Sequence, residues 1–322
     1  MADVILLARY ILSYENLLRR VNCSVTLPYW DWSVFSLTPW HTNRTRIWHD
    51  GPSGLGGDGG LDGCVQNGLF RTKTNGQCLR RRFNGLPPDI IAVYLTQFHQ
   101  PNVIGFNAFE LNLRVNLHDT VHCRVGGDMC FVTSANAPEF FLHHCFIDRI
   151  WANWQEYSEE HMTVHFSGLS GNMSETGYRP AQFINTVDLP DIRYPNNTGR
   201  RTCVSYEDPT HGEYDEIIER LDGMTHDEIL KVPRHSFAPL NTRQLSFFNV
   251  NKQERRQARR NLRRELEPRN ELTGDAGLTG TDRDTGFRLA SLPVNDGNKR
   301  SVLRRKKNTM RDRWMAKNDK QK

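Results

Sequence analysis

The sequence predicts a mainly α-helical protein, with a helical bundle core, long irregular covering loops and a disordered basic C-terminal tail. Three observations support this fold class. Apolar side chains recur at helical spacing in several stretches. The segment from residue 40 to 84 is instead rich in Gly, Asp and Thr, which is typical of a long irregular loop. From residue 251 the composition becomes strongly basic, so we expect a folded domain over 1–250 and a largely disordered tail over 251–322.

Local signals mark where each expected helix begins and ends. A broad apolar face indicates a first helix, paired prolines open the second, paired glycines end the third, and a proline after cap candidates opens the fourth. The fifth is a charged helix with oppositely charged side chains four residues apart. These helices are expected at residues 2–21, 87–98, 106–125, 138–154 and 252–272.

Three histidines on two of these helices indicate a metal site. His118 and His122 are four residues apart, so both rings project from one helix face. His144 lies on the apolar side of the next helix, and Asp148, one turn later, is placed to accept its spare ring N–H. Three imidazoles suit copper, zinc or iron. The alternative is a solvated helix face that carries histidines without a metal.

The stretch from Asn116 to Gln155 resembles the second copper-binding region of tyrosinases and other type 3 copper proteins. That pattern is H-x-x-x-H, a Gly-rich turn, and a proline-led F-x-x-H-H-x-x-x-D-x-x-W helix. The chain matches it with His118, His122, Gly126, Gly127, Pro138, Phe140, His143, His144, Asp148 and Trp151. The aromatic segment LPYWDW, residues 27–32, is also similar to the segment that follows the first copper region of the family.

The resemblance implies copper bound by His118, His122 and His144, with His143 packing against or hydrogen-bonding these ligands. It also implies oxidation of phenols or catechols to o-quinones with dioxygen. Glu110 lies near the position of a family glutamate that orients water and deprotonates phenol, and the alternative for it is a surface salt bridge. Asp119 stands where many tyrosinases have asparagine, which bears on the monophenol step.

The chain departs from the family at the first copper region. The third histidine of that region is expected at or near Leu7 or Ala8, and the first histidine of the sequence is His41. The sequence therefore predicts an N-terminally incomplete copper domain that holds half of a dinuclear site and impaired catalysis. The alternative function is a non-catalytic secreted protein that binds one copper ion or an acidic matrix.

Cysteines and sequons favour the secretory route, although the opening residues are not a convincing signal peptide. Asn22, Asn43, Asn172 and Asn196 are each followed two places on by Ser or Thr. Of the seven cysteines, Cys64 and Cys78 flank the Gly-rich loop and are expected to pair. Cys123, Cys130 and Cys145 are interpreted as apolar filler, and the alternative is that all seven are reduced. No stretch is long enough to span a membrane.

Charge is divided unevenly along the chain. Residues 252–322 contain 21 Lys or Arg and 10 Asp or Glu, so the surplus of 11 in a chain of net charge +5 leaves −6 for the preceding residues. Such a tail is either solvated charge or a contact for anionic surfaces, and no nucleic-acid-binding fold accompanies it. We expect removal of residues 251–322 to leave copper content unchanged.

Overall fold

The structure is a computed structural model of the whole chain. Contacts divide the chain into two units, Met1–Asn270 and Glu271–Lys322. The second unit, with most of the tail predicted to be disordered, lies outside the described residues. The structure describes residues 3–44, 46–71, 77–98, 106–155, 223–232 and 238–266, and single residues or pairs at 161, 179, 182, 189–190, 201–202, 217 and 220–221.

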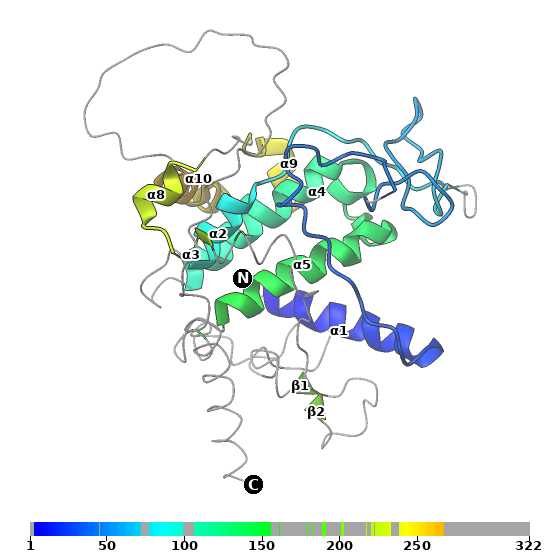
Figure 1. Cartoon of the computed structure of the whole chain (residues 1–322), viewed down its shortest axis with the longest axis horizontal. Coiled ribbons are helices and arrows are strands. Elements are labelled where there is room, and N and C mark those ends of the chain that lie inside the picture. The colour runs from blue at the N-terminus through cyan, green and yellow to red at the C-terminus, as the bar shows by residue number, and fades with distance from the viewer. Residues whose placement is uncertain are drawn as a thin grey trace. The chain divides into compact units, whose positions relative to one another are not determined.

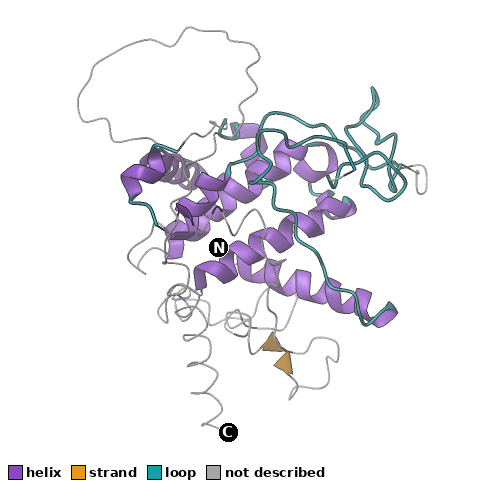
Figure 2. Cartoon of the chain, viewed as in Figure 1, coloured by secondary structure: helices purple, strands orange, loops and turns teal. Residues whose placement is uncertain are grey.

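Helices dominate the described residues, as the sequence predicts (Figure 2). The helices of the core are α1 (Asp3–Val21), α2 (Ile90–Phe98), α3 (Phe106–Leu111), the π-helical segment η2 (Asn112–His118), α4 (Asp119–Val125) and α5 (Pro138–Gln155). Short 3-10 turns, η3 (Gly127–Cys130) and η4 (Ser134–Asn136), join α4 to α5. The later elements are β1 (Leu189–Pro190), β2 (Arg201–Thr202), α8 (His226–Leu230), α9 (Thr242–Phe247) and α10 (Lys252–Leu266). Strands β1 and β2 pair antiparallel.

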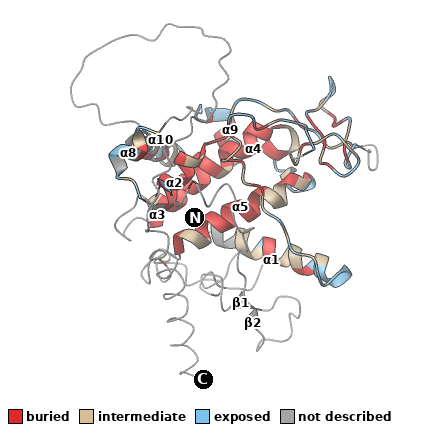
Figure 3. Ribbon diagram, viewed as in Figure 1, coloured by how far each residue is buried: buried red, intermediate tan, exposed pale blue. Residues whose placement is uncertain are grey.

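Helices α1 and α5 lie side by side (Figure 1). The ring of Tyr14 stacks on Phe141 with centroids 3.7 Å apart, and Tyr10 meets Phe140 edge to face. The aromatic segment after α1 is attached to α5 by the Trp30 N–H, which donates to the Leu142 carbonyl at 3.0 Å. Burial is concentrated on α2, α4 and α5, which carry most of the red in Figure 3.

The third expected helix is a run of three segments, because η2 has a wider π turn. The N–H of Asp119 donates to the carbonyl of Arg114, five residues earlier, in place of the α-helical bond. A π turn changes the angle between side chains before and after it. The relative direction of Glu110 and His118 therefore does not follow from ordinary helical spacing.

The described residues of the covering loop, 40–44, 46–71 and 77–84, are irregular, as predicted (Figure 2). The predicted Cys64–Cys78 disulfide is present. Arg81 fastens this loop to the start of α5. Its guanidinium donates to both carboxylate oxygens of Glu139 at 2.9 Å and to the carbonyls of Gly56 and Gly57 at 2.8 Å.

Helix α10 is the predicted basic helix, and it packs against η2 and α2. Ala258 and Asn261 are buried on its inner face, and Glu254 pairs with Arg114 of η2 at 2.8 Å. The expected domain boundary at residue 250 falls just before this helix. The first unit instead ends at Asn270 and therefore includes α10. None of the helices in the described residues is long and apolar enough to cross a bilayer.

Candidate metal centre

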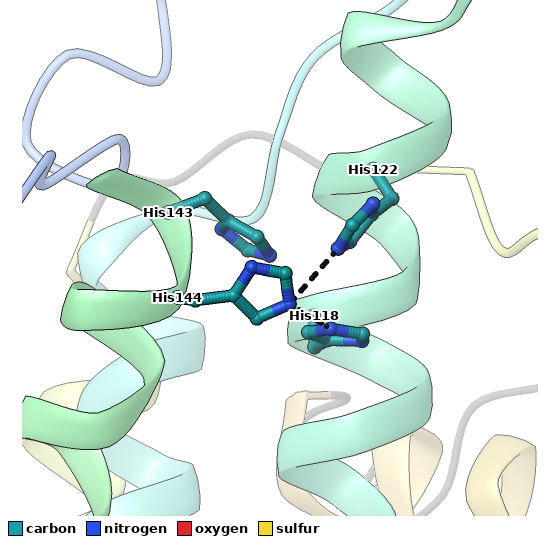
Figure 4. Close-up of side chains that lie close together, drawn as sticks. All are labelled: His118, His122, His143 and His144. Atoms are coloured by element: carbon teal, nitrogen blue, oxygen red, sulfur yellow. Dashed lines mark hydrogen bonds between the residues drawn. The ribbon is translucent and has the colours of Figure 1, made fainter. Parts of the chain in front are cut away.

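Four histidine rings meet between η2, α4 and α5 (Figure 4). His118 ends η2, His122 lies one turn later on α4, and His143 and His144 are adjacent on α5. One ring nitrogen of each lies within 4.8 Å of those of the others. Within the described part of the chain, this is the group of His, Cys, Asp or Glu side chains placed to hold a metal ion.

Three Nε2 atoms converge at the spacing of metal ligands. The Nε2 of His144 is 2.9 Å from that of His118 and 3.3 Å from that of His122. Two nitrogens that bind one metal at about 2.0 Å in tetrahedral geometry lie about 3.3 Å apart. The donor set therefore has the dimensions of a single-ion site.

Each of these three rings has an acceptor at its other nitrogen. The Nδ1 of His118 faces Asp119 Oδ1 at 2.7 Å. Those of His122 and His144 face the carbonyls of Met129 and Phe140, both at 2.6 Å. A carboxylate or carbonyl oxygen accepts only, so the ring hydrogen is assigned to Nδ1 in each case.

This assignment leaves three Nε2 lone pairs directed at one another. Lone pairs about 3 Å apart with no hydrogen between them repel, and a cation between them turns repulsion into coordination. Burial lowers the pKa of His122 and of His144, and the nearby His118 ring lowers both further, while their carbonyl partners oppose the shift. These two rings are therefore neutral, and able to bind a metal, near neutral pH.

His143 has the opposite arrangement. Its Nδ1 accepts a hydrogen bond from the indole N–H of Trp32 at 3.1 Å, so its own hydrogen is on Nε2. Burial lowers the pKa of His143, and the neighbouring imidazoles His122, His144 and His118 add to the effect. A neutral ring with this tautomer has no lone pair at Nε2. The geometry therefore favours His144 over His143 as a ligand, a choice that spacing alone did not make.

Other expected residues lie elsewhere. The carbonyl of Phe140, and not Asp148, accepts the Nδ1–H of His144, because a helix places the carbonyl four residues earlier within reach of a ring that turns back along its axis. Glu110 is not in the histidine group, and its carboxylate accepts from Arg114 at 2.7 Å. This ion pair is buried, whereas the alternative considered for Glu110 was a surface pair.

Two cysteines interpreted as filler form a bond. Cys123 and Cys130 are joined in a disulfide, whereas Cys145 is a buried thiol whose pKa is raised chiefly by burial. The helix predicted for 106–125 hid this pairing, since proximity depends on the turn that follows it. Trp32 was also missed as an orienting residue, although the LPYWDW motif singled out its segment.

A cavity of about 500 Å³ opens on His118 and His144. Apolar side chains form most of its wall, including Leu113, Phe140 and Ile147. Helix α1 contributes Leu7, Arg9 and Tyr10. The described part of α1 therefore presents no imidazole to the cavity.

The fold and the site together define a helical bundle with a largely buried cluster of histidine side chains that could hold a metal ion. Residues 9–157 match the family described as the common central domain of tyrosinase. The chain is 36% identical to a tyrosinase of Streptomyces antibioticus and 38% identical to one of Streptomyces glaucescens, each over 170 residues, 46% of this chain and 60% of the relative. Grixazone synthase of Streptomyces griseus is 29% identical over 237 residues, 58% of this chain and 70% of the relative.

These matches support membership of residues 9–157 in the tyrosinase family of type 3 copper proteins, a family of copper-binding oxidoreductases. The predicted family is thus confirmed. The chain spans about 60% of the length of the two Streptomyces tyrosinases.

Proposed function

We propose that this chain binds one copper ion through the Nε2 atoms of His118, His122 and His144. The observation that carries this proposal is the oxygen acceptor at each of the three Nδ1 atoms, because a ring hydrogen assigned to Nδ1 leaves the three Nε2 lone pairs facing one point. Imidazole nitrogen suits copper as well as zinc, and membership of the family selects copper. In this proposal His143 does not bind the metal; it accepts a hydrogen bond from Trp32 and packs beside the ligand rings.

The reaction we propose is that of the family, the oxidation of phenols or catechols with dioxygen, impaired in this chain because one copper ion is half of the pair that the family uses. When bound, copper would supply the redox chemistry for oxidation of the phenol by dioxygen. The chain holds the ligand rings in one tautomer and offers a cavity whose apolar wall suits an aromatic ring beside His118 and His144. Glu110 stays a candidate for a role in phenol deprotonation, against which its ion pair with Arg114 weighs.

The cavity wall favours a second candidate function, a copper-binding protein without oxidase activity. Type 3 chemistry uses two copper ions, and α1 contributes Leu7, Arg9 and Tyr10, not histidines, to the cavity that His118 and His144 line. Catalysis then depends on imidazoles from outside the described residues. The two candidates differ in the number of copper ions bound and in catechol turnover.

Metal analysis of copper-loaded protein tests the proposal. We expect one copper per chain, lost in His118→Ala, His122→Ala and His144→Ala. The matched control is His143→Gln, whose amide oxygen can accept from Trp32 and which should keep its copper. Two coppers per chain with rapid oxidation of catechol would establish the oxidase and refute the half-site. Retention of copper by His144→Ala would refute the ligand set.

The expected compartment and partners are part of this proposal. Two disulfides among the described cysteines, together with the sequons, favour the secretory route. Exposed basic residues of α10, such as Arg256, Arg259 and Arg260, and the basic residues beyond it favour contact with anionic surfaces. A shift in electrophoretic mobility on treatment of secreted protein with a glycosidase would support the compartment, and recovery of unmodified protein from the cell interior would contradict it.

A further inference from the structure

The disulfide Cys123–Cys130 lies directly beside the hydrogen bond that orients His122. Cys123 follows His122 in the chain, and Cys130 follows Met129, whose carbonyl accepts the Nδ1–H of His122 at 2.6 Å. The hydrogen bond and the disulfide therefore join neighbouring residues at both ends of the same turn. A covalent bond one residue away limits how far the carbonyl can move from the ring.

The first part of this turn is held by the covering loop. Gly126 and Gly127 have φ of +66° and +55°, where an L side chain is strained. The covering loop meets the turn through main-chain bonds from Arg82 N–H to Val125 and from Asp128 N–H to Arg80. After Asp128, the backbone hydrogen bonds in the described residues of the turn join residues of the turn itself, such as the bond from the Met129 N–H to the Gly126 carbonyl at 3.2 Å.

The second part, which carries the acceptor, is held differently. Met129 is 1% exposed, and the disulfide ties Cys130 back to α4. Cys123 and Cys130 are both buried in a small apolar cluster that includes Leu245 and Val250. Phe248 closes this side, with its ring 5.6 Å from that of His122.

From this geometry we infer that the Cys123–Cys130 disulfide is a positioning element for the ligand His122, acting through the carbonyl of Met129. This inference rests on the proposed copper site. Without the disulfide, the turn can open, the Met129 carbonyl moves off Nδ1, and the His122 ring is free to rotate or change tautomer. Loss of such an orienting acceptor commonly weakens metal binding by about 10- to 100-fold.

Paired variants test this role. C123A/C130A removes the bridge, and C64A/C78A, the matched control, removes the other disulfide, which spans the covering loop and has no residue next to a ligand. We expect C123A/C130A to bind Cu(II) at least about 10-fold more weakly than wild type and C64A/C78A to bind within about 2-fold of it. Electron paramagnetic resonance gives a readout that general destabilisation does not move, because the number of coupled imidazole nitrogens should fall from three to two in C123A/C130A alone.

Equal copper affinity and an unchanged nitrogen count in folded C123A/C130A would overturn the inference, as would the same loss in both double variants. If C123A/C130A does not fold, C123A/C130V restores apolar volume without the bridge. The wild-type protein adds an independent test by ring nitrogen magnetic resonance without metal. His122 should carry its hydrogen on Nδ1, and a hydrogen on Nε2 would overturn the inference. Failure of wild type to bind copper would instead refute the proposed function.

Discussion

Substitution of Glu139 by Gln should destabilise the protein more than any surface charge change. Glu139 and Arg81 form a two-point ion pair with both side chains 0% exposed. The glutamine amide would keep one acceptor and turn an amide donor toward a guanidinium donor. The positive charge of Arg81 would then stay buried without a compensating carboxylate.

The size of the effect follows from burial. Removal of one partner of a buried ion pair costs about 3–5 kcal/mol, whereas exposed pairs contribute about 0–1 kcal/mol. A domain is stable by about 5–15 kcal/mol, so Glu139→Gln removes a large share of the free energy of unfolding. Arg81 also donates to two loop carbonyls, and the double variant Arg81→Met/Glu139→Leu should therefore recover only part of the loss.

Urea denaturation followed by tryptophan fluorescence measures this loss, since Arg81 lies 4.7 Å from the ring of Trp48. The control is Glu15→Gln, which weakens the partly exposed pair with Arg19 and should cost less than about 1 kcal/mol. A loss below about 1 kcal/mol in Glu139→Gln would show that the pair does not hold the covering loop to α5.

Three further predictions concern other polar groups of the described residues. Burial raises the pKa of the Asp31 carboxyl from 3.8 to about 6, so the stability of wild type falls as pH rises through that window. In urea titrations, Asp31→Asn should therefore gain stability relative to wild type between pH 4 and pH 7, by at most about 3 kcal/mol. Absence of a gain would contradict the raised pKa. Trp32→Phe leaves the Nδ1 of His143 without its donor and should cost about 1–3 kcal/mol in thermal unfolding at unchanged copper content; loss of copper would show that the metal site depends on this hydrogen bond. A chain ending at residue 250 lacks the Glu254–Arg114 pair and should lose at least about 2 kcal/mol in urea denaturation, whereas one ending at residue 270 should not; equal stability of the two would contradict the packing of α10.

The packing of α10 revises an expectation from the sequence. Composition groups α10 with the basic tail, since most of its residues are charged. Only a few of its residues face the domain: Ala258 and Asn261 are buried, three residues apart, in a segment that is otherwise rich in arginine. That spacing was the available signal, and net charge concealed it. Removal of residues from 251 onward therefore also removes α10, which packs against η2, the segment that ends at His118.

Helices were predictable because side-chain periodicity is local. The same reasoning placed His118 and His122 on one face and identified α1, α2 and α5. The π turn was not predictable, since it is decided by which carbonyl the N–H of Asp119 reaches. The acceptors for two ligand rings are main-chain carbonyls, which every residue has, so no residue type announces them.

Tertiary pairing was the other limit. Cys64 and Cys78 flank a recognisable loop, whereas the partnership of Cys123 and Cys130 requires the positions of the turn between α4 and α5. Nothing in the spacing of Arg81 and Glu139 indicates that they meet. These contacts depend on how the covering loop folds back over the bundle.

Anomalous diffraction at the copper edge from crystals of the copper-loaded chain would locate the metal directly. We expect one peak, about 2.0 Å from the Nε2 atoms of His118, His122 and His144, with Met129 and Phe140 still accepting from the ligand rings. A peak bound by His143, or two peaks bridging toward α1, would contradict the proposed site.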